Sequence, residues 1–292
     1  MAGYIEKKKI AGKTYFYLTE TKRVAGKWKK TRKYLGVHTP AGFEKPRRAH
    51  PKPTLSEKEL KLIEGIKRNY SKKHKIGLNL WKEVREQLVS FVFNTNAIEG
   101  SSLSLEDTDS VLLGKKIKAN KNDILAAKNM KKCIDFIFKY KGEIDEKLVL
   151  KLHAIEMNKI MHDAGTYRNV DVRVGQYICP RHEEVPKLMT RFFDWYRILN
   201  KKLHPFELAA LTHLKFVRIH PFRDGNGRMA RLLMNFVLLK NGYPLLNILN
   251  TEKMLYYLVL QKVDVSKRSK SFVKYLHDVY IKQYVDYLKS EK

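Results

Sequence analysis

The stretch Phe216-Val-Arg-Ile-His-Pro-Phe-Arg-Asp-Gly-Asn-Gly-Arg-Met-Ala-Arg231 gathers a histidine, a carboxylate, two glycines and several arginines in one short segment. Residues 206–219, which lead into it, are apolar on nearly every face and predict a helix buried in a helical bundle. Pro221 ends that helix and leaves His220 at its exit, because a residue before proline avoids the α region. A second helix, with an apolar stripe that begins at Met229, follows the Asp-Gly-Asn-Gly turn. We therefore predict a mainly α-helical protein built around these two helices.

The same stretch carries the chemistry of a phosphate site. A glycine-rich turn before a helix offers unpaired backbone N–H groups and the positive end of the helix dipole. Arg228 and Arg231 add forked donors for phosphate oxygens. Asp224 is the kind of ligand that Mg²⁺ uses beside phosphates, and His220 can accept a proton because its ordinary pKa is about 6.5. We predict a Mg²⁺-nucleotide site beside a general base; the alternative is a plain turn with a satisfied histidine.

The segment His220-Pro-Phe-Arg-Asp-Gly-Asn-Gly-Arg-Met-Ala-Arg231 resembles the complete signature of the Fic family, whose members mostly transfer AMP from ATP to protein hydroxyls. The tripeptide alone is not diagnostic, because His204-Pro-Phe206 repeats it without the glycines and reads as a helix start. The resemblance extends to Gly165-Thr-Tyr-Arg168 and covers residues 85–290. It implies a Fic-type helical bundle with a β-hairpin flap.

The resemblance also implies the activity and the site. The activity is that of a protein AMP-transferase with ATP as substrate and Mg²⁺ as cofactor, acting on a Ser, Thr or Tyr hydroxyl of a protein, including this protein itself. His220 is the catalytic base and Asp224 the metal ligand. The nucleotide-binding residues are Gly225, Asn226, Gly227, Arg228, Arg231 and Tyr257. Tyr257 belongs to the adenosine side of the pocket, and Asp264 stands near a position where relatives often have asparagine.

A second informative stretch ends at Gly100. The apolar spacing from residue 84 onward predicts a helix, with Thr95 and Glu99 on one face and Gly100 as its C-terminal cap. A Thr-x-x-x-Glu-Gly string is common, but beside the signature it resembles the inhibitory motif of some Fic proteins. The resemblance implies that Glu99 pairs with Arg231 and prevents productive γ-phosphate placement, because the carboxylate occupies an arginine fork and repels phosphate.

Residues 170–186 break the helical pattern and alternate with a period of two, which predicts a hairpin. A generic hairpin is one interpretation. By resemblance the hairpin is the Fic flap, which holds a target segment by strand addition. Its target-docking residues are then Val172, Arg173, Val174 and Gly175. The family usually has two prolines where this chain has Cys179-Pro180.

The N-terminal part differs in composition. Residues 1–38 predict a small basic module of three antiparallel strands, and residues 39–55 a basic, proline-rich linker. Residues 56–100 follow as a helical segment that includes the inhibitory helix, and residues 101–292 as the Fic catalytic domain. Aromatic and basic residues alternate in the first module. That mixture suits a nucleic-acid surface or, equally, a minimal sheet that docks on a neighbouring domain.

The net charge of +29 raises the question of a polyanionic partner. Residues 1–53 contain fifteen Lys or Arg and three Glu, so they are more basic per residue than the rest. Nucleic acid is one target for that segment. A lysine bias throughout the chain, as some thermophiles show, explains the same total. The two interpretations stay open.

The composition argues against a disulfide-rich protein and against a membrane protein. Two cysteines are too few for a disulfide framework and predict a reducing cytoplasm. No apolar signal segment and no run of about 20 apolar residues is present, so we expect a soluble protein with no membrane partner. The sequence allows a homo-oligomer but does not determine the oligomeric state. Two functional alternatives remain: removal of AMP with water positioned by Glu99, and a nucleic-acid-binding regulator whose nucleotide site is vestigial or sensory.

Overall fold

The computed structural model describes residues 4–10, 13–24, 27–36, 53–74, 84–175, 177–263 and 269–288. The chain forms two compact units, residues 1–52 and 53–292. Most of the expected linker, residues 39–52, and Asp264 lie outside the described residues. The second unit is almost entirely helical, which confirms the predicted fold class.

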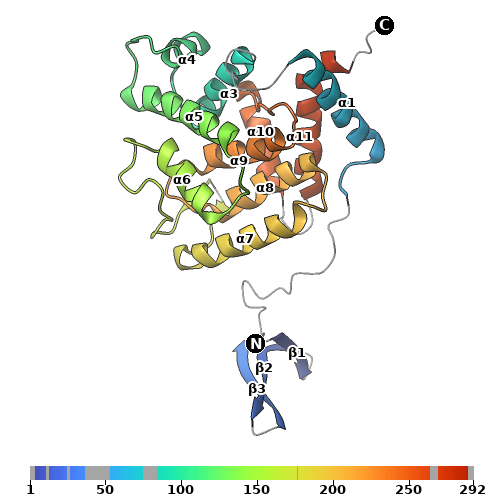
Figure 1. The fold of residues 1–292 in the computed structure, drawn as a ribbon. Coiled ribbons are helices and arrows are strands. Elements are labelled where there is room, and N and C mark those ends of the chain that lie inside the picture. Colours follow the sequence, from blue (N-terminus) through green and yellow to red (C-terminus); the bar gives the residue numbers. More distant parts are fainter. Residues whose placement is uncertain are drawn as a thin grey trace. The chain divides into compact units, whose positions relative to one another are not determined.

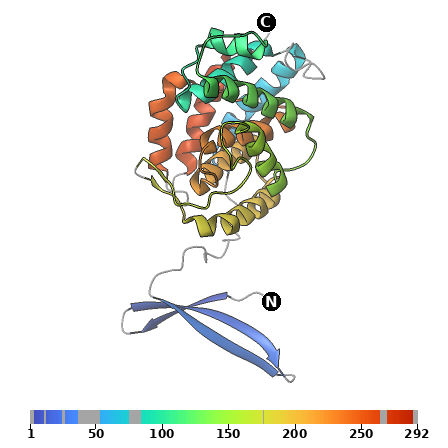
Figure 2. The ribbon, with the colours of Figure 1, turned by 90° about the vertical axis from the view of Figure 1, so that its left-hand side faces the viewer.

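The first unit is a three-stranded antiparallel meander, as the sequence predicts. Strands β1 (Tyr4–Ile10), β2 (Lys13–Val24) and β3 (Lys27–Gly36) are paired in chain order. The register pairs Tyr4 with Thr19, and Arg23 with Trp28. Figure 2 shows the twist of the long strands. The aromatic side chains on which the nucleic-acid alternative depends lie outside the description, so that alternative stays a prediction.

The second unit is a bundle of helices interrupted by one short hairpin (Figure 1). Among the described residues, no helix is both long enough and apolar enough to cross a membrane. The helices and the two strands of the hairpin have these bounds: α1 (Glu57–Lys73), α3 (Arg85–Ile98), α4 (Leu105–Leu112), α5 (Lys121–Lys139), α6 (Glu146–Glu156), β4 (Arg173–Val174), β5 (Tyr177–Ile178), α7 (Val185–Leu199), α8 (Pro205–Ile219), α9 (Asn226–Lys240), α10 (Lys253–Lys262) and α11 (Ser269–Gln283).

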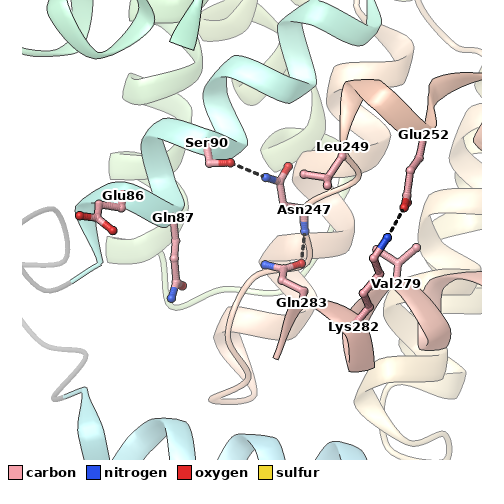
Figure 3. Close-up of a pocket in the computed structure, with 9 residues that line it drawn as sticks. All are labelled: Glu86, Gln87, Ser90, Asn247, Leu249, Glu252, Val279, Lys282 and Gln283. Atoms are coloured by element: carbon pink, nitrogen blue, oxygen red, sulfur yellow. Dashed lines mark hydrogen bonds and ion pairs between the residues drawn. The ribbon is translucent and has the colours of Figure 1, made fainter. Parts of the chain in front are cut away.

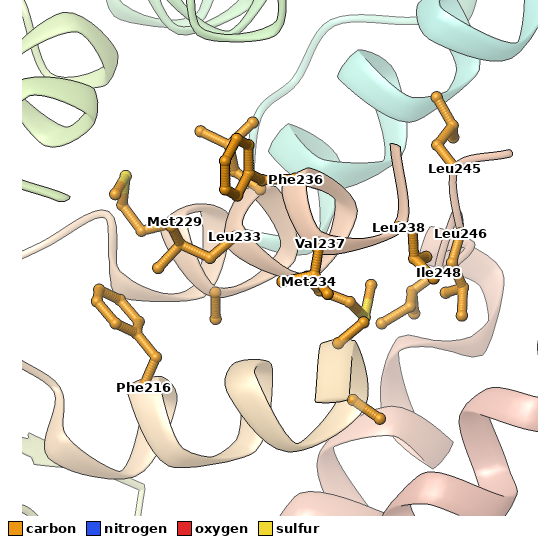
Figure 4. Packing of buried hydrophobic residues seen from close by; sticks show 14 of the residues in the cluster. Phe216, Met229, Leu233, Met234, Phe236, Val237, Leu238, Leu245, Leu246 and Ile248 are labelled. Carbon is orange, nitrogen blue, oxygen red and sulfur yellow. The ribbon is translucent and has the colours of Figure 1, made fainter. Parts of the chain in front are cut away.

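Helices α8 and α9 form the centre of the bundle. Figure 4 shows Phe216 of α8 facing Met229 and Leu233 of α9, and all three side chains are fully buried. Each such side chain contributes roughly 1.5–3 kcal/mol through burial. Four polar residues of α9 are buried as well, namely Asn226, Arg228, Asn235 and Arg231, the last at 1% exposure. A buried arginine needs polar partners, so α9 requires a cluster of polar residues within the core that it helps to form.

Sequence signals at the helix ends explain where the elements start and stop. Ser56 and Glu59 close a capping box at the start of α1, and Ser104 and Asp107 do the same for α4. Gly100 follows α3 with φ of 100°, a left-handed conformation that glycine adopts without strain. The C-terminal helix α11 ends at Gln283, and a short 3₁₀ turn, Val285–Tyr287, follows.

Candidate active site

His220 lies between the two central helices in an unusual backbone conformation. It ends α8 with φ of 52° and ψ of 59°, in the left-handed region that non-glycine residues seldom adopt. The proline effect correctly places it outside the right-handed α region but does not identify this conformation. Arg168 holds the strained residue, because its Nε donates to the carbonyl oxygen of His220 over 2.8 Å. Strain at a functional residue persists only where surrounding contacts fix it.

The imidazole of His220 is poised to accept a proton. Its Nδ1 lies 3.1 Å from the carbonyl oxygen of Val217. A carbonyl can only accept a hydrogen bond, so Nδ1 carries the proton and Nε2 keeps its lone pair. Burial lowers the pKa of His220 below its ordinary value, against the opposing effect of the Val217 contact. The ring is therefore neutral at physiological pH, as a general base must be.

The turn after His220 exposes the start of α9. Gly225 has φ of 77°, and no described side chain caps the helix. The Asn226 side chain instead closes the turn, because it accepts from the backbone N–H of Phe222 and donates to the Phe222 carbonyl. His153 stacks on the Phe222 ring at 3.6 Å, and its Nε2 lies 3.1 Å from the Asp224 carbonyl oxygen. Uncapped N–H groups at a helix start are suited to binding an anion.

Asp224 sits on the solvent side of this turn. Its side chain is 65% exposed, and one of its oxygens accepts from the Gly225 N–H over 2.6 Å. The other oxygen lies 3.7 Å from Nη2 of Arg228. One accessible carboxylate beside a phosphate-binding turn fits Mg²⁺, which commonly binds one or two carboxylates together with substrate phosphates.

The structure brings Thr95 and Glu99 to Arg231. Nη2 of Arg231 donates to Oε1 of Glu99 over 2.7 Å and to the carbonyl oxygen of Thr95 over 2.9 Å, while Nε donates to the Thr95 hydroxyl over 2.8 Å. Both residues of the Thr-x-x-x-Glu string thus contact one buried guanidinium. Its Nη1 has no hydrogen-bond partner among the described residues.

Glu99 also covers the start of α9. A Cβ atom on residue 227 would collide with Oε1 of Glu99, so the carboxylate lies directly against the backbone of Gly227. Burial by itself would raise the pKa of Glu99, but the charge and hydrogen bond of Arg231 outweigh it and the pKa is lowered. Glu99 is therefore an anion at neutral pH, placed against the first turn of α9.

Polar contacts with the segment after α9 hold the helix that carries Glu99. Asn94 accepts from the backbone N–H of Asn250 over 2.8 Å, and Asn247 donates to the Ser90 hydroxyl over 3.0 Å. The second contact borders a cavity of about 380 Å³ between α3, residues 247–252 and α11 (Figure 3). Tyr257, expected on the adenosine side, donates to the carbonyl of Ile98 at the end of α3 over 3.2 Å.

The expected flap is present as the hairpin of β4 and β5, with Arg173 paired to Ile178 and Val174 to Tyr177. Ile178 is 78% exposed. Arg168, at 3% exposure, joins this hairpin to the catalytic loop: besides His220 it bonds the carbonyls of Val170 and Pro180 at the two ends of the hairpin. The resemblance includes Arg168, but its role as the common anchor is evident only from the contacts.

One residue of the site was missed entirely. Glu156, the last residue of α6, is fully buried, and its Oε1 lies 2.8 Å from Nε of Arg228. Burial raises the pKa of Glu156 to about 7, although the charge of Arg228 works against this. A sequence signal existed: Glu156 falls on the same helical face as Val149 and Leu152, and a carboxylate within an apolar stripe needs a partner.

Comparison with known proteins agrees with this geometry. Residues 143–238 match the model of the Fic/DOC family. A protein adenylyltransferase Fic of Drosophila willistoni is 32% identical over 249 residues, which make up 82% of this chain and 50% of the relative. Two solved structures are similar with a TM-score of 0.66: a Fic domain containing signaling protein of Bacteroides thetaiotaomicron (28% identity, 77% of this chain, 96% of that chain) and a fragment of Fic-1 of C. elegans (25% identity, 80% and 74%).

The fold and the site together define a helical domain of the Fic type. The chain belongs to the Fic/DOC family. It spans about half the length of the curated relatives that it matches.

Proposed function

We propose that the protein transfers AMP from ATP to a hydroxyl group of a protein and that Glu99 restrains this activity. The observation that carries the proposal is the turn after α8, which joins a neutral His220 to the uncapped start of α9. A base beside an anion site suits transfer of a phosphate-linked group to a hydroxyl. The relatives named protein adenylyltransferase Fic support AMP as that group.

In the proposed reaction, Nε2 of His220 removes the proton from a Ser, Thr or Tyr hydroxyl. The oxygen attacks the α-phosphorus of ATP, a new P–O bond forms, and the bond to the β-phosphate oxygen breaks. Pyrophosphate leaves with that electron pair. His220 holds the abstracted proton as an imidazolium until solvent removes it. The acceptor segment lies along residues 172–175 of the flap, which Arg168 anchors to the same loop as His220.

The nucleotide contacts follow from the site. Backbone N–H groups of Gly225, Asn226 and Gly227 bind phosphate oxygens, Arg228 and Arg231 bind the β- and γ-phosphates, and Tyr257 lies on the adenosine side. Asp224 would hold Mg²⁺, which supplies charge neutralisation to the phosphates when bound. Arg231 can serve the γ-phosphate fully only after Glu99 leaves, because Glu99 occupies its Nη2.

Removal of AMP is the second candidate. The observation that favours it is the 30% exposure of the Glu99 side chain, which leaves a carboxylate within reach of water next to the anion site. In that reaction Glu99 positions the attacking water, so its loss abolishes activity. Transfer behaves oppositely, because loss of Glu99 frees the site.

The test compares wild type, Glu99→Gly and His220→Ala. Each is incubated with Mg²⁺-ATP and analysed by intact mass spectrometry for AMP on itself, and then with AMP-modified protein purified from the Glu99→Gly reaction. Transfer predicts labelling that rises in Glu99→Gly and is absent in His220→Ala. Equal labelling in all three contradicts the proposal, and removal of AMP by wild type but not by Glu99→Gly assigns hydrolysis of the AMP–protein bond instead.

A further inference from the structure

Glu156 lies directly beneath the phosphate-binding turn. Its side chain is fully buried, and Oε1 lies 2.8 Å from Nε of Arg228. A Cβ on residue 225 would come within 2.7 Å of Oε2 of Glu156. Gly225 therefore has two reasons to lack a side chain: its left-handed backbone and the carboxylate beneath it.

Arg228 and Arg231 consequently each contact a carboxylate, but the two carboxylates differ. Glu99 is 30% exposed and follows the last turn of α3, so movement of one helix end can withdraw it. Glu156 is enclosed within the bundle, and its own backbone carbonyl accepts from the side chain of buried Asn129 over 3.1 Å. Glu156 cannot leave without dismantling the end of α6. It is a fixed partner of Arg228 rather than a removable brake.

Stability alone does not account for a carboxylate at this position. Neither oxygen of Glu156 makes an aligned hydrogen bond to any described residue, and the contact with Arg228 is an ion pair without hydrogen-bond geometry. The desolvation penalty of a buried charge can exceed what one ion pair returns. A buried, poorly satisfied carboxylate next to a functional arginine indicates a role in the site.

We propose that Glu156 is a positioning residue for nucleotide binding, which holds Nε of Arg228 and thereby keeps the guanidinium from closing its long, 3.7 Å ion pair with Asp224. The inference rests on the proposed function, in which Arg228 and Asp224 both serve the nucleotide. Arg228 lies between two carboxylates, with Glu156 at 2.8 Å and Asp224 at 3.7 Å. Without the nearer carboxylate, the guanidinium has Asp224 as its remaining anionic partner, and a closer Asp224–Arg228 pair withdraws both groups from the phosphates.

An Arg228 held by Glu156 at Nε keeps its two terminal nitrogens, Nη1 and Nη2, available for phosphate. Glu156 uses Nε, whereas Nη2 makes only long contacts, at 3.5 Å with the sulfur of Met157 and at 3.7 Å with Asp224, and a phosphate oxygen easily replaces the weak sulfur acceptor. Two forked N–H groups of one arginine suit bidentate phosphate binding. Glu156 thus orients Arg228 at the one nitrogen that such binding does not need.

The test measures ATP affinity directly. The parent is Glu99→Gly/His220→Ala, which has an unlocked site but no base, so calorimetry with Mg²⁺-ATP reports binding without turnover. Adding Glu156→Gln should raise the Kd for ATP roughly tenfold, the effect of losing one charge-assisted contact between Arg228 and a phosphate group. Adding Arg228→Ala should raise Kd at least as much, and Glu156→Gln should then add nothing, because residues that act through one another are not additive. A Kd within about twofold of the parent, or equal effects of Glu156→Gln with and without Arg228, overturns the proposal.

A matched control separates positioning from general destabilisation. Glu207 is another buried carboxylate, 2% exposed, which accepts from the N–H groups of Thr54 and Leu55 about 20 Å along α8 from His220. Glu207→Gln should lower Tm and leave Kd unchanged. If Glu156→Gln fails to fold, Glu156→Asp keeps the charge but shortens its reach: a Kd increase supports the proposal, and an unchanged Kd overturns it. Because binding is the readout, absence of AMP transfer would refute the proposed function and leave this result intact.

Discussion

Oε1 of Glu99 lies 2.7 Å from Nη2 of Arg231 and against the backbone of Gly227, where a side chain would begin. One carboxylate oxygen therefore accepts a hydrogen bond from Arg231 and at the same time lies against the first turn of α9. A phosphate bound to that turn would meet a like charge at close range. In our proposal, inhibition is competition between Glu99 and the nucleotide for one position.

The Thr95 hydroxyl should contribute to this restraint. It accepts from Nε of Arg231 over 2.8 Å and helps to orient the guanidinium toward Glu99. Thr95→Val removes the hydroxyl at nearly constant volume and should raise AMP transfer roughly threefold to tenfold, the range set by the net contribution of one typical intramolecular hydrogen bond. Initial rates of labelling measure the effect.

Thr95→Ser is the matched control, because it keeps the hydroxyl and removes a methyl group. It should stay close to wild type. If Thr95→Val and Thr95→Ser behave alike, the hydroxyl has no part in the restraint.

Arg168 should couple the flap to the catalytic loop. Its guanidinium bonds the carbonyls of His220, Val170 and Pro180, and a lysine ammonium cannot span the same three acceptors. In the Glu99→Gly background, Arg168→Lys should lower the transfer rate by about 100-fold, as misplaced catalytic groups do. Hydrogen exchange in residues 170–180 should become faster while ATP affinity stays the same.

Arg173→Lys is the control on the exposed surface of the flap, where loss of the fork should not alter exchange. Unchanged exchange in Arg168→Lys would show that Arg168 does not anchor the hairpin.

His153 should make the protein sensitive to mild acid. Burial lowers its pKa from 6.5 to about 4, so the unfolded state binds a proton that the folded state refuses. Its stabilising contribution is complete above pH 6.5 and is lost as the pH falls toward 4. Between pH 7 and pH 5 the free energy of unfolding should fall by about 2 kcal/mol from this group alone.

Urea unfolding of wild type and His153→Gln at the two pH values measures this contribution. The variant should lose about 2 kcal/mol less than wild type, because glutamine does not titrate. Parallel losses in the two proteins would show that His153 is protonated equally in both states. Glu99 does not confuse the result, since its pKa is lowered and its contribution falls away only in stronger acid.

The sequence predicts the helices and the turn that carry this site, because local sequence signals specify them. The helix-ending proline, the glycine turn and the helical spacing after Met229 place α8 and α9, and the interval from Thr95 to Glu99 sets both groups on one face. These are short-range rules of backbone geometry. The pairing of Glu99 with Arg231 came from family resemblance, because no local rule joins residues so far apart.

The residues that the sequence did not identify act through tertiary contacts. Glu156 appears as an ordinary acidic residue at the end of α6 until the fold buries it under Gly225. His153 likewise supports the turn after α8 only once the fold stacks it on Phe222. For such residues the available signal is a polar side chain on an apolar face, and only the packed structure names its partner.

The most direct test of the account is the initial rate of AMP transfer by wild type and Glu99→Gly at equal Mg²⁺-ATP, read by intact mass spectrometry, with His220→Ala in both backgrounds as the blank. Freeing Nη2 of Arg231 and the start of α9 should raise the rate at least roughly tenfold, the effect of one charge-assisted contact. His220→Ala should abolish transfer in either background. A Glu99→Gly protein that transfers AMP no faster than wild type would contradict the central claim.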